Sequence, residues 1–204
     1  MKKSIALIFL LSIFFYSFSQ ERKLDDSLLV EKPKQVFTSG FYFGPSIGSN
    51  NISGIIGILA EARVYKNFTL AGGLGILFWG PKFSLQARYY KKYPLSFYYG
   101  LGISSISGFK GRIINLNVEP EGKPEDVNLD YADVKLINIS IGDQLRLGRR
   151  TRLNFEFGYA IPMQTEFYKI KTSGVVLTKD SENLLDSMAP GGFILGITFS
   201  LGLF

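Results

Sequence analysis

The 204-residue chain contains no cysteine and no histidine, and each absence excludes a class of function. Without cysteine there is neither a disulfide nor a cysteine-linked lipid anchor. Histidine is the side chain that most often acts as a general base near neutral pH, and hydrolases and acyltransferases commonly depend on it. Zinc spacings, nucleotide-binding loops and calcium loops are also missing from the sequence. We therefore expect no enzymatic activity, no bound metal and no cofactor.

The excess of positive over negative charge is also small. The formal net charge is +6, and because residues 1–19 hold two lysines and no acid, the rest of the chain carries +4. The basic residues are scattered along the chain instead of forming runs. This distribution gives no support to nucleic acid as a partner.

Only one long apolar run occurs, although 46% of the residues are hydrophobic. It extends over 4–18, follows Lys2 and Lys3, and ends in the small-x-small pair Ser17 and Ser19. This pattern predicts a secretory signal peptide over 1–19, removed before Gln20, and a polar periplasmic tether over 20–36. A retained transmembrane helix is the alternative, but the run is shorter than the roughly 20 residues that span a bilayer.

From Phe37 onward, large apolar residues alternate with small or polar ones. In the closing segment, Phe193, Leu195 and Ile197 share one face of a strand, while Gly196 and Thr198 share the other. The same period of two recurs in eight segments: 41–48, 56–65, 69–78, 83–90, 95–104, 137–147, 153–161 and 191–204. The chain therefore predicts an all-β fold, an eight-stranded antiparallel transmembrane up-and-down β-barrel over 37–204.

The connectors between these segments alternate between short and long, with the long ones at 108–133 and 164–190. Outer-membrane barrels have short periplasmic turns and longer external loops, so we expect an outer-membrane location with both mature termini in the periplasm. The stretches 112–118 and 167–172 also alternate. They could form a protruding sheet with edges open to a partner strand, or add two strands to give a ten-stranded barrel.

Aromatic side chains are expected in two girdles at the membrane interfaces. The periplasmic girdle would contain Tyr65, Phe68, Tyr89, Tyr90, Tyr93 and Phe204, and the outer girdle Phe78, Trp79, Phe109, Phe167 and Tyr168. The 108–133 connector is acidic; a solvated loop is the simple interpretation, with a calcium or lipopolysaccharide contact as the alternative. Asp143 falls in an apolar row, which predicts a β-bulge there or a position near the periplasmic interface.

The polar rows of the segments should face a narrow lumen. Eight strands enclose a space that side chains can fill, and buried charges must pair there to offset desolvation. We expect a polar cluster of Glu61, Arg63, Gln86, Arg88, Gln144, Arg146 and Glu156. A structural plug is the main interpretation of this cluster. A gated proton or ion path along Glu61, Arg88 and Glu156 is the alternative.

The opening Gly40 Phe41 Tyr42 Phe43 Gly44 Pro45, the eight alternating segments and the terminal Phe204 resemble the small outer-membrane β-barrel families. The chain looks most like the PorT-type outer membrane protein beta-barrel domain group, with an architecture similar to OmpA and OmpX. In such families the last strand carries the assembly signal, here Phe199, Leu201, Leu203 and Phe204, although Gly202 stands where an aromatic residue is usual. The resemblance implies a structural, assembly or secretion-associated envelope protein. Its implied partners are outer-membrane lipid, lipopolysaccharide, the barrel-assembly machinery and an envelope complex.

Two other functions fit the sequence less well. One is a small transport or adhesion barrel of the OmpX or OmpW kind that binds an amphiphile or a surface partner. The other is a secreted barrel resembling a lipocalin, with the apolar rows facing a ligand cavity. Eight strands hold only one small ligand, so the apolar rows are too many for such a cavity.

Overall fold

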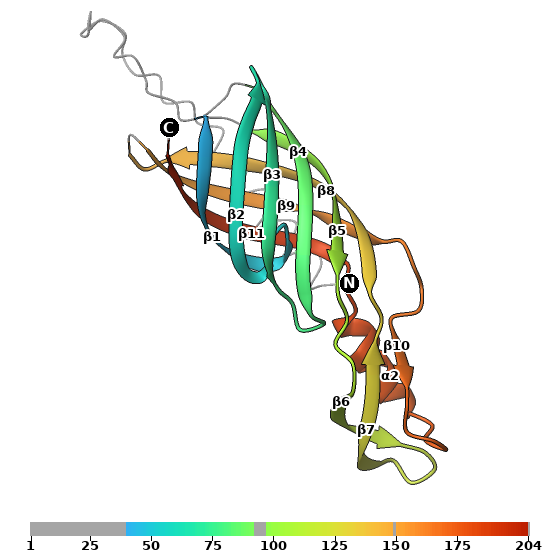
Figure 1. Ribbon diagram of the computed structural model, residues 1–204. Coiled ribbons are helices and arrows are strands. Elements are labelled where there is room, and N and C mark those ends of the chain that lie inside the picture. The colour runs from blue at the N-terminus through green and yellow to red at the C-terminus, as the bar shows by residue number, and fades with distance from the viewer. Residues whose placement is uncertain (1–39, 92–96, 149, 204) are drawn as a thin grey trace, which may run out of the picture. The chain divides into compact units, whose positions relative to one another are not determined.

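A computed structural model describes residues 40–91, 97–148 and 150–203, all within the unit Phe37–Phe204 (Figure 1). The expected signal peptide, the tether, Tyr93 and Phe204 lie outside the described residues. Eight antiparallel strands close into a barrel in the order β1-β2-β3-β4-β5-β8-β9-β11, with β11 paired to β1. The strands are β1 (Phe41–Asn51), β2 (Gly54–Tyr65), β3 (Phe68–Ile76), β4 (Pro81–Tyr90), β5 (Tyr98–Ile106), β8 (Val134–Arg146), β9 (Thr151–Pro162) and β11 (Gly192–Gly202).

Each strand of the barrel overlaps one of the eight segments that the alternation predicts, so the eight-stranded fold is confirmed. The ten-stranded alternative is wrong, because the two extra stretches pair outside the barrel. β6 (Arg112–Val118), β7 (Lys123–Tyr131) and β10 (Tyr168–Ile170) form a separate sheet in the order β10-β7-β6. This sheet belongs to the two long connectors, β5 to β8 and β9 to β11.

The helix α2 (Lys179–Met188) lies in the second long connector and completes what we call the cap, made of β6, β7, β10 and α2. Thr178 is its N-cap, with a side-chain oxygen that accepts a hydrogen bond from the backbone N–H of Ser181, and Asp180 and Glu182 lie in its first turn. The helix buries Ser181 and Leu185. Among the described residues, no helix is sufficiently long and apolar to cross a membrane.

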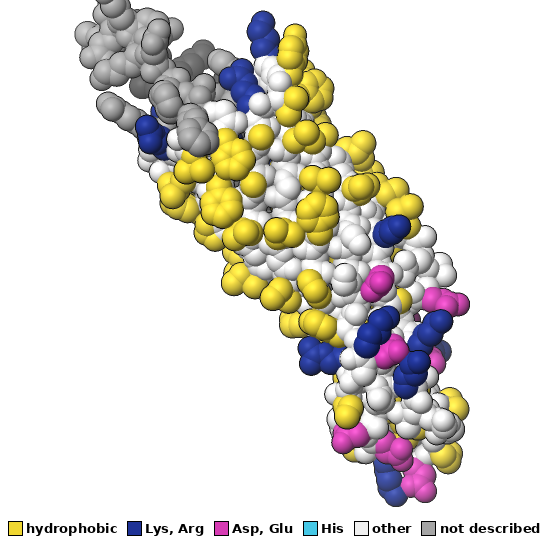
Figure 2. Space-filling view, in the orientation of Figure 1, with side chains coloured by type: hydrophobic (Ala, Val, Ile, Leu, Met, Phe, Trp, Pro, Cys, Tyr) yellow, Lys and Arg dark blue, Asp and Glu magenta, His cyan; other side chains and the backbone are white. Residues whose placement is uncertain are grey.

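The apolar rows of the barrel strands point outward and are exposed (Figure 2). In β4 the alternation is complete, since Phe83, Leu85 and Tyr89 are exposed while Ser84, Gln86 and Arg88 are buried. Leu101 in the middle of β5 has 61% of its surface exposed. The protein is therefore polar inside and apolar outside along most of the barrel wall, the reverse of an ordinary folded core.

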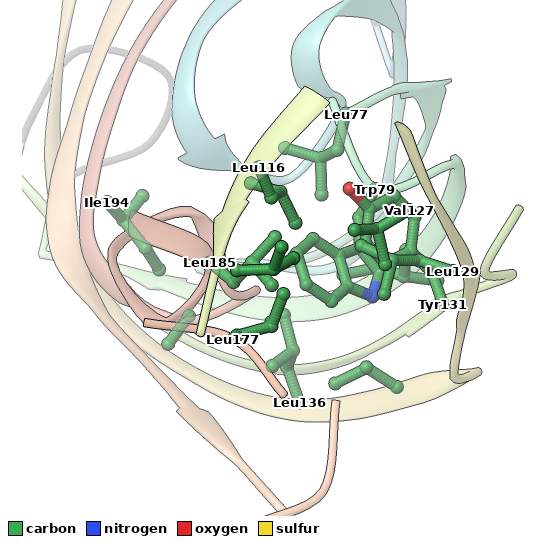
Figure 3. Packing of buried hydrophobic residues seen from close by; sticks show 14 residues of the cluster. Leu77, Trp79, Leu116, Val127, Leu129, Tyr131, Leu136, Leu177, Leu185 and Ile194 are labelled. Atoms are coloured by element: carbon green, nitrogen blue, oxygen red, sulfur yellow. The ribbon is translucent and has the colours of Figure 1, made fainter. Parts of the chain in front are cut away.

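The cap closes one mouth of the barrel through a hydrophobic core (Figure 3). Trp79, from the β3–β4 connector, is 1% exposed and stacks on Tyr131 of β7 with ring centroids 4.0 Å apart. Inward-facing residues at the strand ends contribute from below: Ile106, Val134, Leu136, Ala160 and Ile194. The cap contributes Leu116, Val118, Val127, Leu129 and Leu185, and Leu177 just before α2 joins them.

This core corrects two expectations. Trp79 is not part of an outer girdle, and Phe109, Phe167 and Tyr168 also pack against the core. Only Phe78 of that set is largely exposed, at 72%. In the predicted periplasmic girdle, Tyr65, Phe68 and Tyr89 are exposed while Tyr90 is fully buried. The outer aromatic residues pack inward because β7, which we expected to be an acidic loop, buries Val127, Leu129 and Tyr131 beneath its charges. Tyr90 is buried for a different reason, since it belongs to the inward row of β4.

Asp143 lies in the outward row of β8 without a β-bulge. The pairing of β8 with β9 runs without a shift from Leu136 to Arg146, so the bulge that we considered is absent. Instead, Asp143 is three residues from the end of β8, and its Oδ1 accepts a hydrogen bond from the backbone N–H of Gln144 at 2.9 Å. The position near the periplasmic interface, which was the other expectation, stays a prediction.

Candidate functional site in the barrel lumen

The inward row of β4 follows the lumen along the barrel. Lys82, Ser84, Gln86, Arg88 and Tyr90 alternate with the outward row and are all at most 2% exposed. Strand side chains alternate with a period of two, so a single strand can place a polar group at every level of the lumen. The side chains that fill the lumen form three layers along this row, and the layers differ in their chemical character.

The deepest layer is a network of buried ion pairs around Arg88. Its Nη1 lies 2.8 Å from Glu61 Oε2 and its Nη2 lies 3.2 Å from Glu156 Oε2. A second arginine, Arg152 of β9, places its Nη2 3.1 Å from the same Glu61 Oε2. Two arginines thus face two glutamates, so the charges of this layer compensate one another without solvent.

Neutral side chains complete the hydrogen bonding of these charges. The Tyr90 hydroxyl donates to Glu61 Oε1 at 2.8 Å and accepts from Gln144 Nε2 at 2.6 Å. Gln144 Oε1 in turn accepts from Arg152 Nη1 at 3.0 Å. Because each glutamate oxygen has a donor, the layer behaves as one connected unit.

Aromatic rings pack against both guanidinium groups. The Arg88 guanidinium carbon lies 4.7 Å from the Tyr98 ring centroid, and that of Arg152 lies 3.4 Å from the Tyr42 centroid. The Tyr98 ring reaches across to β8, where a Cβ on Gly142 would overlap it. A glycine at that position leaves the space that the ring occupies.

The middle layer consists of hydroxyls, amides and a turn that folds into the lumen. Asn51, Ile52 and Ser53 at the β1–β2 turn are at most 3% exposed. The Lys82 ammonium donates to the backbone carbonyls of Asn50 at 2.9 Å and Asn51 at 2.7 Å. Glycines of two strands accommodate this turn, because a Cβ on Gly196 would lie 2.8 Å from Asn51 Cβ and one on Gly73 would overlap the Ile52 carbonyl.

The third layer is the hydrophobic core beneath the cap, which contains Trp79. From one mouth to the deepest layer, the lumen is thus occupied by an apolar layer, an inward turn held by Lys82, and the paired charges. Among the described residues, no three side chains of the histidine, cysteine, aspartate or glutamate type are grouped to hold a metal ion.

The structure brings together five of the seven residues of the expected polar cluster: Glu61, Gln86, Arg88, Gln144 and Glu156. Arg63 and Arg146 lie apart from it. Arg63 is exposed near the end of β2 and donates to the Lys66 carbonyl at 3.0 Å, and Arg146 at the end of β8 donates to the Gly148 carbonyl at 2.7 Å. Both long side chains reach toward the strand ends instead of the lumen, as arginines near an edge commonly do.

Sequence reasoning left Arg152, Tyr90 and Tyr98 out of the cluster. The signal was available, because Arg152 has the same parity as Asn154 and Glu156 on β9. Arg152 was left out because the predicted segment 153–161 begins one residue after it, whereas β9 begins at Thr151. The last-strand residues Phe199, Leu201 and Leu203 are exposed on the outward face.

Comparison with protein-family models finds no match for the chain, and comparison with curated proteins finds none either. By its structure, the protein is a closed eight-stranded antiparallel β-barrel. The charges in its polar lumen are paired, and a cap covers one mouth.

Proposed function

We propose that the protein is a non-enzymatic integral barrel of a bacterial outer membrane, with a structural, assembly or secretion-associated role in the envelope. The observation that carries the proposal is the exposed apolar surface. Outward-facing residues such as Leu74, Phe83, Leu101, Phe157 and Leu195 stay exposed on successive strands around the barrel. Soluble monomers rarely expose contiguous apolar patches larger than a few hundred Å², whereas a lipid bilayer covers such a belt.

The distribution of charge supports the same proposal. Arg88, Glu61 and Glu156 are buried inside the barrel, while the outward face of its strands is mainly aliphatic and aromatic. A secreted lipocalin-like barrel would need the opposite arrangement, with apolar side chains around an internal ligand. The lipocalin-like alternative is therefore disfavoured.

The three filled layers of the lumen favour a structural protein over a transporter. A solute would have to displace the turn that Lys82 holds. It would also have to separate buried ion pairs, whose charges have no solvent nearby to stabilise them once separated. The cap, in contrast, presents a folded surface beyond the barrel, as a protein that anchors or assists an envelope complex requires. Adhesion by the cap is the second candidate function. Its outer tip carries exposed Glu119, Glu121 and Glu125.

Substituting a charge into the apolar belt tests the proposal. Leu101→Arg is expected to make folding into lipid bilayers less favourable by about 2–4 kcal/mol, since Leu101 lies near the middle of β5. Ile113→Arg is the matched control, because Ile113 is equally apolar and 67% exposed but belongs to the cap. It should change the free energy by less than about 0.5 kcal/mol. The measurement is reversible unfolding in vesicles, followed by heat-modifiable migration.

Equal effects of the two substitutions, or release of the unmodified protein into buffer without detergent, would contradict a membrane location.

Planar bilayers distinguish the structural role from transport. We expect the purified full chain to insert without discrete current steps, because side chains occupy each layer of the lumen. A porin of known conductance in the same bilayers serves as the control for insertion. Reproducible current steps from the barrel would favour transport, whereas copurification of a silent barrel with an envelope complex would favour the assembly role.

A further inference from the structure

β10 is one edge of the cap sheet, whose strand order is β10-β7-β6 (Figure 1). At the other edge, the far half of β6 is already covered by α2 and the segment that leads into it. Asn117 donates its backbone N–H to Ser181 Oγ at 3.0 Å. Glu119 donates its backbone N–H to the Val176 carbonyl at 2.8 Å. Among the described residues, no strand pairs with the side of β10 that faces away from β7, so this edge presents its main-chain groups to an incoming strand.

The main-chain groups of β10 alternate between its two sides. Lys171 donates its backbone N–H to the Asn128 carbonyl at 2.9 Å, so the odd-numbered residues of this segment point their main-chain groups toward β7. In an antiparallel ladder, neighbouring residues along a strand point these groups in opposite directions. The N–H and C=O groups of Tyr168 and Ile170 therefore point away from β7, and they have no hydrogen-bond partner among the described residues. We call these groups the open edge.

Acidic side chains of α2 lie on the core side of the open edge. Tyr168 packs against the cap core, and its pKa is raised by burial and then by Asp186 and Glu182, so both carboxylates lie near its hydroxyl. These two acids are four residues apart, which places them on one side of α2, and both are exposed. α2 carries a third acid, Asp180, and the single cation Lys179. The core side of the open edge is therefore negatively charged.

The outer side of the open edge is balanced in charge. Lys169 is directly opposite Asp130 in the register of β10 with β7, and Lys171 Nζ lies 3.4 Å from Asp130 Oδ2. Asp126 has the same parity on β7 as Asp130 and lies on the same face. Ile170 itself has 37% of its surface exposed. The two faces of an incoming strand would thus meet different surroundings, with acids in excess on the core side only.

We propose that the open edge binds an extended segment of a partner protein by strand addition, with basic side chains at every second position. An extended backbone repeats its N–H and C=O groups every two residues, about 6.8 Å, as Tyr168 and Ile170 do. In this mode of recognition main-chain pairing supplies the affinity, and alternate side chains supply the specificity. Basic residues at every second position all lie on one face, beside Glu182 and Asp186. The inference rests on the proposed assembly role, whose partner it describes.

A second copy of the chain does not have the required pattern of charge. Two β10 strands that pair antiparallel in one continuous sheet are related by a twofold axis perpendicular to the sheet, so their outer faces coincide. Lys169 and Lys171 of both copies would then lie on the outer face, away from the acids of α2 and beside one another. Lysines on an edge strand oppose such self-pairing. The occupant is therefore a different protein.

The first test uses the full chain in uncharged detergent and two labelled nine-residue peptides of the same composition. In one peptide lysine alternates with threonine, and in the other the lysines stand in adjacent pairs. Fluorescence anisotropy at low ionic strength measures their binding. The alternating peptide is expected to bind about fivefold more tightly, because all of its lysines face the acids of α2. Equal affinities, or no binding of either peptide, would overturn the proposal.

Proline substitutions test the main-chain pairing. Ile170→Pro removes an N–H group from the open edge and none from the ladder with β7, and it should weaken binding of the alternating peptide by at least about fivefold. Ile113→Pro is the matched control. Like that of Asn117, the N–H of Ile113 faces away from β7, but at the opposite edge of the sheet, so binding should stay within about twofold. Equal losses in the two variants, or no loss in either, would contradict strand addition at β10.

Charge-matched double variants test the role of α2. Glu182→Gln with Asp186→Asn should weaken binding of the alternating peptide by about fivefold. Glu119→Gln with Glu125→Gln removes the same charge from exposed sites at the tip and should leave binding within about twofold. Equal effects of the two pairs would refute the basic pattern of the partner. A dimer of the unmodified protein that Ile170→Pro abolishes would assign the open edge to a second copy, and would overturn the proposal as well.

Heat-modifiable migration is recorded on the same samples. If it is retained while binding does not depend on the open edge, the docking site is refuted but the membrane barrel is not. Its loss from the unmodified protein refutes the membrane barrel.

Discussion

Replacing Arg88 by alanine is expected to lower the free energy of unfolding by about 3–5 kcal/mol, the usual cost of breaking a buried ion pair by removing one partner. Arg88 contacts Glu61, Glu156 and Gln86, and its own side chain is fully buried. After the substitution Glu61 keeps Arg152 and Tyr90, but among the described residues Glu156 keeps only the amide of Gln86 as a hydrogen-bond donor. Glu156 retains the electrostatic attraction of Lys82, and the loss of its ion pair with Arg88 accounts for most of the expected loss.

Unfolding in urea with vesicle-inserted protein measures this loss. The matched control is Arg63→Ala, since Arg63 is exposed and should change the free energy by less than about 1 kcal/mol. Adding Glu156→Gln to Arg88→Ala should recover part of the stability, because it removes the unpaired charge. A second substitution that deepens the loss, or an Arg63→Ala variant as unstable as Arg88→Ala, would contradict the ion-pair explanation.

Replacing Trp79 by alanine is expected to cost about 3–5 kcal/mol and to detach the cap while the barrel stays closed. Trp79 is the largest fully buried side chain, and it packs between the barrel mouth and the cap sheet through Tyr131 and Phe167. The strands of the barrel are joined to one another by continuous ladders that do not involve this residue. Loss of the indole should therefore loosen the long connectors first.

Limited proteolysis combined with heat-modifiable migration separates these effects. In Trp79→Ala we expect cleavage within 108–133 and 163–191 at protease concentrations that leave the unmodified protein intact, with migration of the folded barrel unchanged. Phe78→Ala is the control, since Phe78 is next to Trp79 in the chain but its side chain is exposed. Trp79→Phe should cost less than alanine, because phenylalanine keeps an aromatic ring and the indole N–H has no hydrogen-bond partner within the described part of the chain. Equal resistance of the connectors to proteolysis in all variants would contradict the prediction that Trp79 holds the cap in place.

The barrel strands were predictable because their signal is local. A period of two in residues such as Phe83, Gln86 and Arg88 assigns each side chain to a face, whatever the rest of the chain does. Pairing of the lumen charges could be expected for the same reason, since an inward row in a narrow barrel has no other means of compensating Glu61 and Glu156.

The cap was predictable only in part. β6 was identified from its alternation, but β7 combines buried Val127 and Leu129 with the charges of Glu125 and Asp126, a composition that also suits a solvated loop. α2 is ten residues long and buries little more than Leu185, so its periodicity is too weak to stand out.

By itself, the sequence determined the eight alternating barrel segments, the face of the strand on which each side chain lies, and the apolar character of the outer wall, because each follows from alternation along one strand. Whether two further stretches join the barrel was decided by the tertiary structure. Only the tertiary structure decided which charges meet, that Arg152 joins them while Arg63 does not, and that Trp79 closes the mouth instead of lying at a membrane interface. Those outcomes depend on register between strands and on a turn and a cap folding back over the lumen. Such contacts join residues far apart in the chain, and no local pattern encodes their distances.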